Sequence, residues 1–101
     1  MDYVARLTFR PAASAQEMDA ALARRASWNY PAGVQMIAEY WPLSADLSVV
    51  AIFSADDIGS IWELQAEWSD VFDIDIAPAV SAEEGLRIGP DVFGRLQRLQ
   101  Q

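Results

Sequence analysis

Only a few types of side chain in this 101-residue chain could take part in catalysis or ligand binding. It has no histidine, cysteine or lysine, and its seven basic residues are all arginine, set against fifteen acidic residues. This composition excludes Cys–His or Ser–His nucleophile pairs, a Schiff-base lysine, a P-loop lysine and any imidazole or thiolate metal site. The remaining candidates are carboxylates, arginines and aromatic rings.

Glu39 is the first catalytic candidate, because it is the only acidic residue in an apolar segment from Val34 to Trp41. If it is buried, its pKa rises and it becomes a general acid or base. The alternative is a solvated or ion-paired residue at a sheet edge, and we favour that alternative.

Asp75 is the second catalytic candidate, with Arg6 as its partner. In a strand with alternating faces, Arg6 and Arg10 lie opposite Asp73 and Asp75 on the neighbouring strand, so they can pair across strands. We favour an ion pair at a dimer seam. The alternative is an arginine clamp for a carboxylate ligand, with an aspartate as the base.

Aromatic residues are abundant, with four tryptophans and three tyrosines. Packing of these rings in the core is the favoured interpretation. The alternative is an aromatic pocket for a planar ligand, to which Tyr40, Trp62 and Trp68 are assigned as ligand-binding residues. A metal site would have to use oxygen ligands alone and no EF-hand spacing is present, so we expect neither metal nor cofactor.

The first half of the chain predicts a strand, a helix and a hairpin. Residues 3–10 alternate between apolar and polar and stop at a proline, which is typical of a strand. The capping-box spacing of Ser14 and Glu17 predicts a helix over 15–27, with Arg24 and Arg25 outside its apolar stripe of Met18, Ala21, Leu22 and Ala26. Two apolar segments, 34–41 and 47–53, predict a hairpin.

The second half predicts a helix and a fourth strand. Asp56 or Asp57 caps the helix, whose core-facing side is expected to comprise Ile58, Ile61, Leu64, Gln65 and Trp68. Residues 71–77 alternate again, and we expect this strand to end at Pro78. The order β-α-β-β-α-β predicts an α+β fold, the ferredoxin-like sandwich with a four-stranded antiparallel sheet and two helices on one face.

Residues 1–80 are expected to form this domain, with 81–101 as its C-terminal helical tail. Gly85 and the pair Gly89-Pro90 are expected to break any long helix there, and Asp91 to start a final turn or two. The apolar stripe of the tail must pack on its own domain or on a neighbour, unless the tail is a frayed helix.

Charge and hydropathy restrict the partners. A net charge of −8 argues against nucleic acid and against anionic membrane surfaces. No apolar run reaches the roughly 20 residues of a membrane span, and the N-terminus lacks the pattern of a signal peptide. We therefore expect a cytoplasmic protein.

Several motifs in fixed order resemble one family. They are Trp28-Asn-Tyr-Pro-Ala-Gly-Val34, Ser54-Ala-Asp-Asp57, Trp68-Ser-Asp70 and Phe72-Asp-Ile-Asp-Ile-Ala-Pro-Ala-Val80. Over residues 1–82 the chain resembles a small bacterial family of unknown function, domain of unknown function 3303, in the dimeric α/β-barrel, ferredoxin-like superfamily. The resemblance implies a homodimer with pockets between helices and sheet, in a superfamily that includes cofactor-free monooxygenases and isomerases. It supplies no catalytic motif that can be transferred residue by residue.

The functional prediction follows from these observations. We expect a homodimer joined through the open faces of its sheets, acting in non-catalytic assembly or in binding of a small apolar or aromatic ligand. The alternative is a cofactor-independent isomerase or monooxygenase-like enzyme acting on a small cyclic or aromatic acid, with Glu39 or Asp75 as base and Arg6 as clamp. The open face is expected to be mixed, with the β-branched residues Val4, Thr8, Ile37, Val50, Ile52 and Val71 beside the charged ones.

Overall fold

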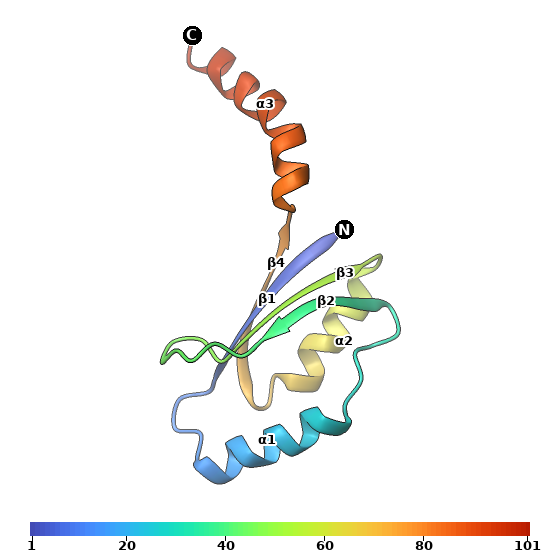
Figure 1. The fold of residues 1–101 in the computed structure, drawn as a ribbon, viewed down its shortest axis with the longest axis vertical. Coiled ribbons are helices and arrows are strands. Elements are labelled where there is room, and N and C mark those ends of the chain that lie inside the picture. The colour runs from blue at the N-terminus through green and yellow to red at the C-terminus, as the bar shows by residue number, and fades with distance from the viewer.

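A computed structural model describes all residues from 1 to 101 (Figure 1). The strands and helices follow one another in the order β-α-β-β-α-β, and a third helix completes the chain. Their bounds are β1 Asp2–Phe9, α1 Ala15–Ser27, β2 Val34–Tyr40, β3 Val49–Ala55, α2 Ile58–Trp68, β4 Phe72–Ala79 and α3 Ala82–Leu99.

The four strands form one antiparallel sheet in the order β2-β3-β1-β4. Ala21 of α1 and Ile61 of α2 join one apolar core with Ala5 and Phe53 of the sheet, so both helices cover the same sheet face. Phe53 is fully buried at the centre of this core. The predicted ferredoxin-like α+β fold is therefore confirmed.

Helix α1 begins where the capping box predicts. The Ser14 hydroxyl accepts a hydrogen bond from the Glu17 amide, and the Glu17 carboxylate accepts one from the Ser14 amide. The predicted range 15–27 is confirmed. The predicted apolar stripe is mostly wrong, because only Ala21 is buried and Met18, Leu22 and Ala26 are exposed. Arg25, predicted to lie outside the stripe, points to the sheet and lines a cavity.

Helix α2 is capped by Asp57, whose side chain accepts from the Ser60 amide. Ile61, Leu64 and Trp68 are buried as predicted. Ile58 and Gln65 were wrongly placed on this side, since both are exposed. Ile58 is the first residue of α2 and Gln65 is off the i, i+3, i+7 row that the three buried residues define.

Strand β4 does not end at Pro78, as we had predicted, but continues to Ala79. Pro78 pairs with Tyr3 of β1. The strand tolerates a proline because β4 is at the edge of the sheet, so the missing N–H would have faced solvent.

Strand β2 contains a bulge. Its pairing with β3 shifts between Met36 and Ala38, so that Ile37 is an extra residue without a partner. Met36 pairs with Phe53 on the helix side. Beyond the bulge Glu39 pairs with Ala51, also on the helix side, although strict alternation from Met36 would place Glu39 on the other face.

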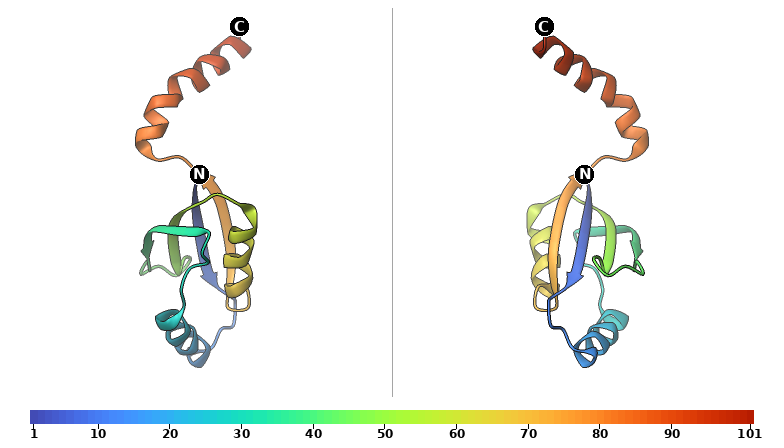
Figure 2. Two further views of the ribbon diagram at one scale, coloured as in Figure 1. Left: turned by 90° about the vertical axis from the view of Figure 1, so that its right-hand side faces the viewer. Right: turned by 90° about the vertical axis from the view of Figure 1, so that its left-hand side faces the viewer.

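The prediction that glycine and proline break the tail is wrong. Helix α3 is continuous over 18 residues, with Ser81 as its N-cap and Pro90 inside it. A well-capped helix tolerates glycine at about 1 kcal/mol each. The proline lacks the N–H that would bond to the carbonyl four residues earlier, and the helix axis bends along its length (Figure 2).

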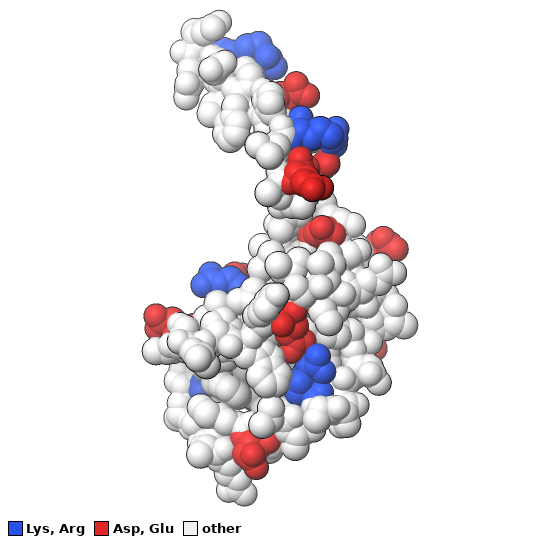
Figure 3. Space-filling view, viewed as in Figure 1, with Lys and Arg blue, Asp and Glu red and all other residues white.

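Helix α3 projects away from the rest of the molecule, which gives the chain a length of 57 Å against widths of 30 and 20 Å (Figures 1 and 2). In Figure 3 its charged side chains lie along one side and the other side is uncharged. At helical spacing the exposed apolar residues of α3 fall on the side opposite its charges, and they are Leu86, Val92, Phe93, Leu96 and Leu99. None of the helices is both long enough and apolar enough to cross a membrane.

Candidate ligand-binding site

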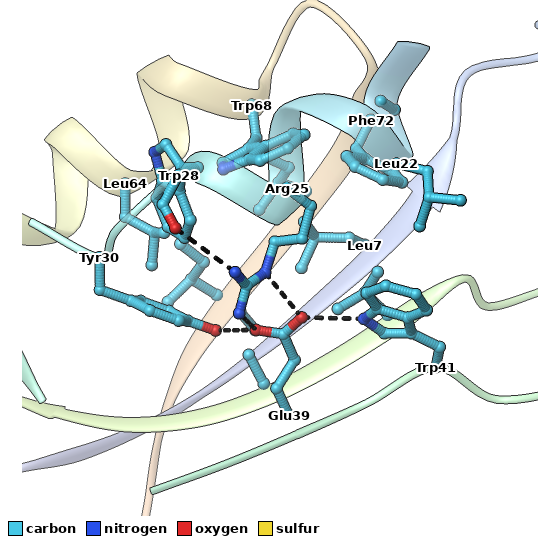
Figure 4. Close-up of a pocket in the computed structure, with 16 residues that line it drawn as sticks. Leu7, Leu22, Arg25, Trp28, Tyr30, Glu39, Trp41, Leu64, Trp68 and Phe72 are labelled. Atoms are coloured by element: carbon cyan, nitrogen blue, oxygen red, sulfur yellow. Dashed lines mark hydrogen bonds and ion pairs between the residues drawn. The ribbon is translucent and has the colours of Figure 1, made fainter. Parts of the chain in front are cut away.

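A cavity of about 90 Å³ lies between the two packed helices and the sheet (Figure 4). This volume is several times the roughly 10–15 Å³ that a single water requires. Of its 16 lining residues 14 are hydrophobic, and the other two are Arg25 and Glu39. The hydrophobic ones are Ala5, Leu7, Ala21, Leu22, Trp28, Tyr30, Trp41, Val49, Ala51, Leu64, Trp68, Phe72, Ile74 and Ile76.

Small side chains create this space. Ala5 of β1 and Ala51 of β3 are direct partners in the sheet and both face the helices. Ala21 is the buried residue of α1. Because three alanines meet where larger side chains would otherwise fill the layer, a hollow remains between helix and sheet.

The cavity opens beside Leu22 and Trp41, which lie on the same side of it in Figure 4. Leu22 is 53% exposed and Trp41 is 52% exposed, although both line the cavity. The wall of the cavity is therefore in contact with solvent at this point, which is where a small molecule would enter.

Glu39 is the centre of a polar network at the cavity wall (Figure 4). Its carboxylate accepts from Arg25 Nε at 3.1 Å, from the second Arg25 nitrogen at 2.9 Å and from Trp41 Nε1 at 2.8 Å. The Tyr30 hydroxyl donates a fourth hydrogen bond. A carboxylate has about four acceptor positions, so those of Glu39 are all occupied.

The network keeps Glu39 ionised. Burial alone would raise the pKa of Glu39, but hydrogen bonds from Arg25, Tyr30 and Trp41 outweigh it, and the pKa is lowered. The raised pKa that we considered for a buried Glu39 is therefore wrong. In the other direction, burial and the hydrogen bond to Glu39 raise the pKa of Tyr30, so its hydroxyl stays protonated as a donor.

The guanidinium of Arg25 uses only some of its N–H groups in hydrogen bonds to the protein. A guanidinium carries five N–H groups. Two of them donate to Glu39 and one, at 3.4 Å, to the Trp28 carbonyl, which leaves two without a protein acceptor. The guanidinium also lies 5.6 Å from the ring centres of Trp28 and Tyr30.

Aromatic rings form one wall of the cavity. Trp28 packs against Tyr30 at 4.7 Å and edge-on against Trp68 at 5.5 Å between ring centres. Arg24 lies over the Trp68 ring at 4.7 Å while its two terminal nitrogens donate to Asp70, which fixes α1 against the end of α2. These contacts fix the positions of the rings in the cavity wall.

The structure brings only some of the residues expected at a site together. Glu39 and Trp68 line the cavity. Tyr40 and Trp62 do not line the cavity. Tyr40 lies on the opposite sheet face, where it pairs with Val50 and is 71% exposed. Trp62 lies on the outer side of α2 and is 70% exposed.

Arg6 and Asp75 lie on the sheet face away from the cavity. They are direct partners in the β1–β4 register and both are exposed. None of the three ion pairs in the structure joins them. Arg10 donates instead to the Ser69 carbonyl.

Sequence reasoning missed Arg25, Tyr30 and Trp41 as site residues. A signal existed for Arg25, which follows Ala21 by four residues and Leu22 by three, so it continues the helical stripe. Tyr30 lies in a turn and Trp41 directly follows β2, and no periodicity applies to either position.

Carboxylates elsewhere do not converge, and no group of three or more potential metal ligands occurs in the structure. The molecule is thus a ferredoxin-like α+β domain with an apolar, aromatic-walled cavity between its helices and its sheet. The chain belongs to the family described as Domain of unknown function (DUF3303), whose model matches residues 1–93. No curated protein shows a significant match to the sequence.

Proposed function

We propose that the protein binds a small apolar or aromatic molecule in the cavity between the helices and the sheet, and that it does so as a homodimer. The observation that carries the first part is the cavity itself, hydrophobic at 14 of 16 lining residues and open beside Leu22 and Trp41. Apolar cavities with a few oriented polar groups are the usual form of small-molecule sites.

The geometry supports binding over catalysis by proton abstraction. Glu39 has its acceptor positions filled and its pKa lowered, so it is poorly suited to take a proton from a substrate. Asp75 and Arg6, the other suggested base and clamp, lie on the opposite side of the sheet. The enzyme alternative is therefore left without a carboxylate that both lines the cavity and is free to take a proton.

A thermal-shift screen with small aromatic and cyclic compounds tests ligand binding. A ligand at 100 times its Kd adds about 2.7 kcal/mol to the free energy of unfolding, which is a readily measured shift. Leu22→Trp is expected to plug the opening and abolish the shift, because Leu22 lies at the mouth and is half exposed. Ala23→Trp, an exposed position on α1 outside the cavity, is the matched control and should leave the shift intact. Persistence of the full shift in Leu22→Trp would contradict the proposed site.

Two uncovered apolar surfaces support the second part, the homodimer. The sheet face away from the helices presents Val50, Ile52 and Val4, with Ile37 and Tyr40 more than half exposed at its edge. The apolar side of α3 has no partner within the chain. Surfaces of this kind usually mark an interface, and a twofold partner could cover both. The cytoplasm remains the compartment expected from the sequence.

Reversing the charge of Arg6 is expected to weaken the dimer. Arg6 stands opposite Asp75 on the proposed interface, so Arg6→Glu would leave that face of each copy with acidic residues and no nearby arginine from β1. Sedimentation equilibrium at micromolar concentration should then show a shift toward the 11.2 kDa monomer. Glu63→Arg, a charge reversal of the same size and opposite sign at an exposed position on α2, should leave the dimer intact. A wild-type protein that sediments as a monomer would refute the dimer.

A further inference from the structure

The polar network at the cavity wall restricts the chemistry of the ligand further. We propose that the cavity selects a neutral aromatic molecule that carries a hydrogen-bond acceptor, such as a carbonyl oxygen, over the carboxylate of the same shape. This proposal rests on the proposed ligand-binding function, and it names the ligand class for that site.

The charge of the cavity is the first restriction on the ligand. Arg25 and Glu39 are the only charged residues among those that line the cavity, and they form a bidentate ion pair at 2.9 Å. Their charges cancel, so the cavity is neutral before a ligand enters. A carboxylate would bring an uncompensated negative charge next to Glu39 in apolar surroundings, which is strongly unfavourable.

The hydrogen-bonding groups of the network are the second restriction on the ligand. Glu39 has no free acceptor position, because Arg25, Tyr30 and Trp41 occupy all four. The two N–H groups of Arg25 without a protein acceptor are donors. Because Arg25 lines the cavity, these are the donors that an acceptor oxygen of a ligand would meet there.

The shape of the cavity wall is the third restriction on the ligand. Trp28, Tyr30 and Trp68 form an aromatic wall, with ring centres 4.7 and 5.5 Å apart, and Phe72 and Trp41 also line the cavity. Aromatic rings pack on one another in stacked or edge-to-face arrangements at these distances. A planar ring that places its acceptor toward Arg25 fits both the wall and the donors (Figure 4).

Isothermal titration calorimetry at neutral pH with benzamide, benzoate and toluene tests the selection. Benzamide and benzoate have the same shape but differ in charge, and toluene lacks the acceptor. We expect the wild-type protein to bind benzamide most tightly and benzoate at least roughly tenfold more weakly than benzamide. Benzoate binding as tight as benzamide would overturn the proposal while leaving the ligand-binding function standing. Failure of all three probes to bind the folded protein would count against both.

Glu39→Gln gives the converse test. The amide keeps the shape and an acceptor for Arg25 but removes the negative charge, so the site becomes cationic. Its affinity for benzoate should rise by roughly tenfold, while that for benzamide changes little. If the variant is folded by circular dichroism and does not gain benzoate binding, the proposal is wrong.

A double variant tests the same proposal without relying on Glu39→Gln alone. Arg25→Met with Glu39→Gln removes both charges and both free donors together. Benzamide should then lose its advantage over toluene, and benzoate should gain nothing. Retention of the benzamide preference in this folded variant would show that Arg25 does not supply the selecting donors.

Discussion

Replacing Trp68 with alanine is expected to lower the free energy of unfolding by about 3–5 kcal/mol. Trp68 is only 5% exposed and packs against Trp28 at 5.5 Å and Phe72 at 5.9 Å between ring centres. Its removal leaves a void and also takes away the surface on which Arg24 lies. Thermal denaturation should show a melting temperature lower by roughly 12 °C or more, at about 4 °C or more for each kcal/mol in a domain of this size.

Trp62→Ala is the matched control for this substitution. Trp62 lies on the same helix but is 70% exposed, so its replacement should change stability by no more than about 0.5 kcal/mol. Equal losses for the two tryptophans would contradict the packing of α2 on the sheet. Because Trp68 also lines the cavity, its alanine variant should accept a bulkier ring than the wild-type protein does.

Gly33→Ala is the second substitution with a large expected effect. A Cβ at position 33 would stand 2.0 Å from Ser60 Oγ and 2.8 Å from Ser60 Cβ. Rotation of the serine hydroxyl relieves the first contact but not the second, so the turn before β2 must move away from α2. Overpacking of this kind costs about 1–3 kcal/mol, measurable by urea denaturation.

A double variant shows whether Ser60 is the cause. Ser60→Gly removes both clashing atoms, so Gly33→Ala with Ser60→Gly should lose less stability than the sum of the two single changes. Gly89→Ala, where the nearest atom would be at 3.9 Å, should cause no loss. Strict additivity of the two changes at positions 33 and 60 would show that the clash is not the source of the effect.

The elements that follow local rules could be predicted from the sequence. The capping box at Ser14 and Glu17 gave the start of α1, and alternation in β1 and β4 gave their buried faces. These signals lie within a few residues of one another, so no tertiary information was needed to interpret them. The strand order of the ferredoxin-like fold then put Arg6 or Arg10 beside Asp73 or Asp75, and of these pairs the register contains Arg6 with Asp75.

The features that the sequence did not predict depend on contacts between distant elements. The bulge at Ile37 reverses the alternation of β2 and directs Glu39 to the helices, and no residue type marks that position. Arg25 reaches Glu39 across 14 positions in sequence. Pro78 and Pro90 were interpreted as terminators, yet an edge strand and a capped helix accommodate them.

The two edges of the sheet have a consequence for how copies of the chain can associate. The edge strand β2 is interrupted by the bulge at Ile37, and the edge strand β4 carries Pro78 together with exposed Asp73 and Asp75. Bulges, prolines and charges each obstruct the main-chain pairing by which one sheet continues into the next. Open-ended growth into fibrils is therefore hindered at both edges. The sheet face and the projecting helix remain as the surfaces for the proposed homodimer, which would be a closed, finite particle.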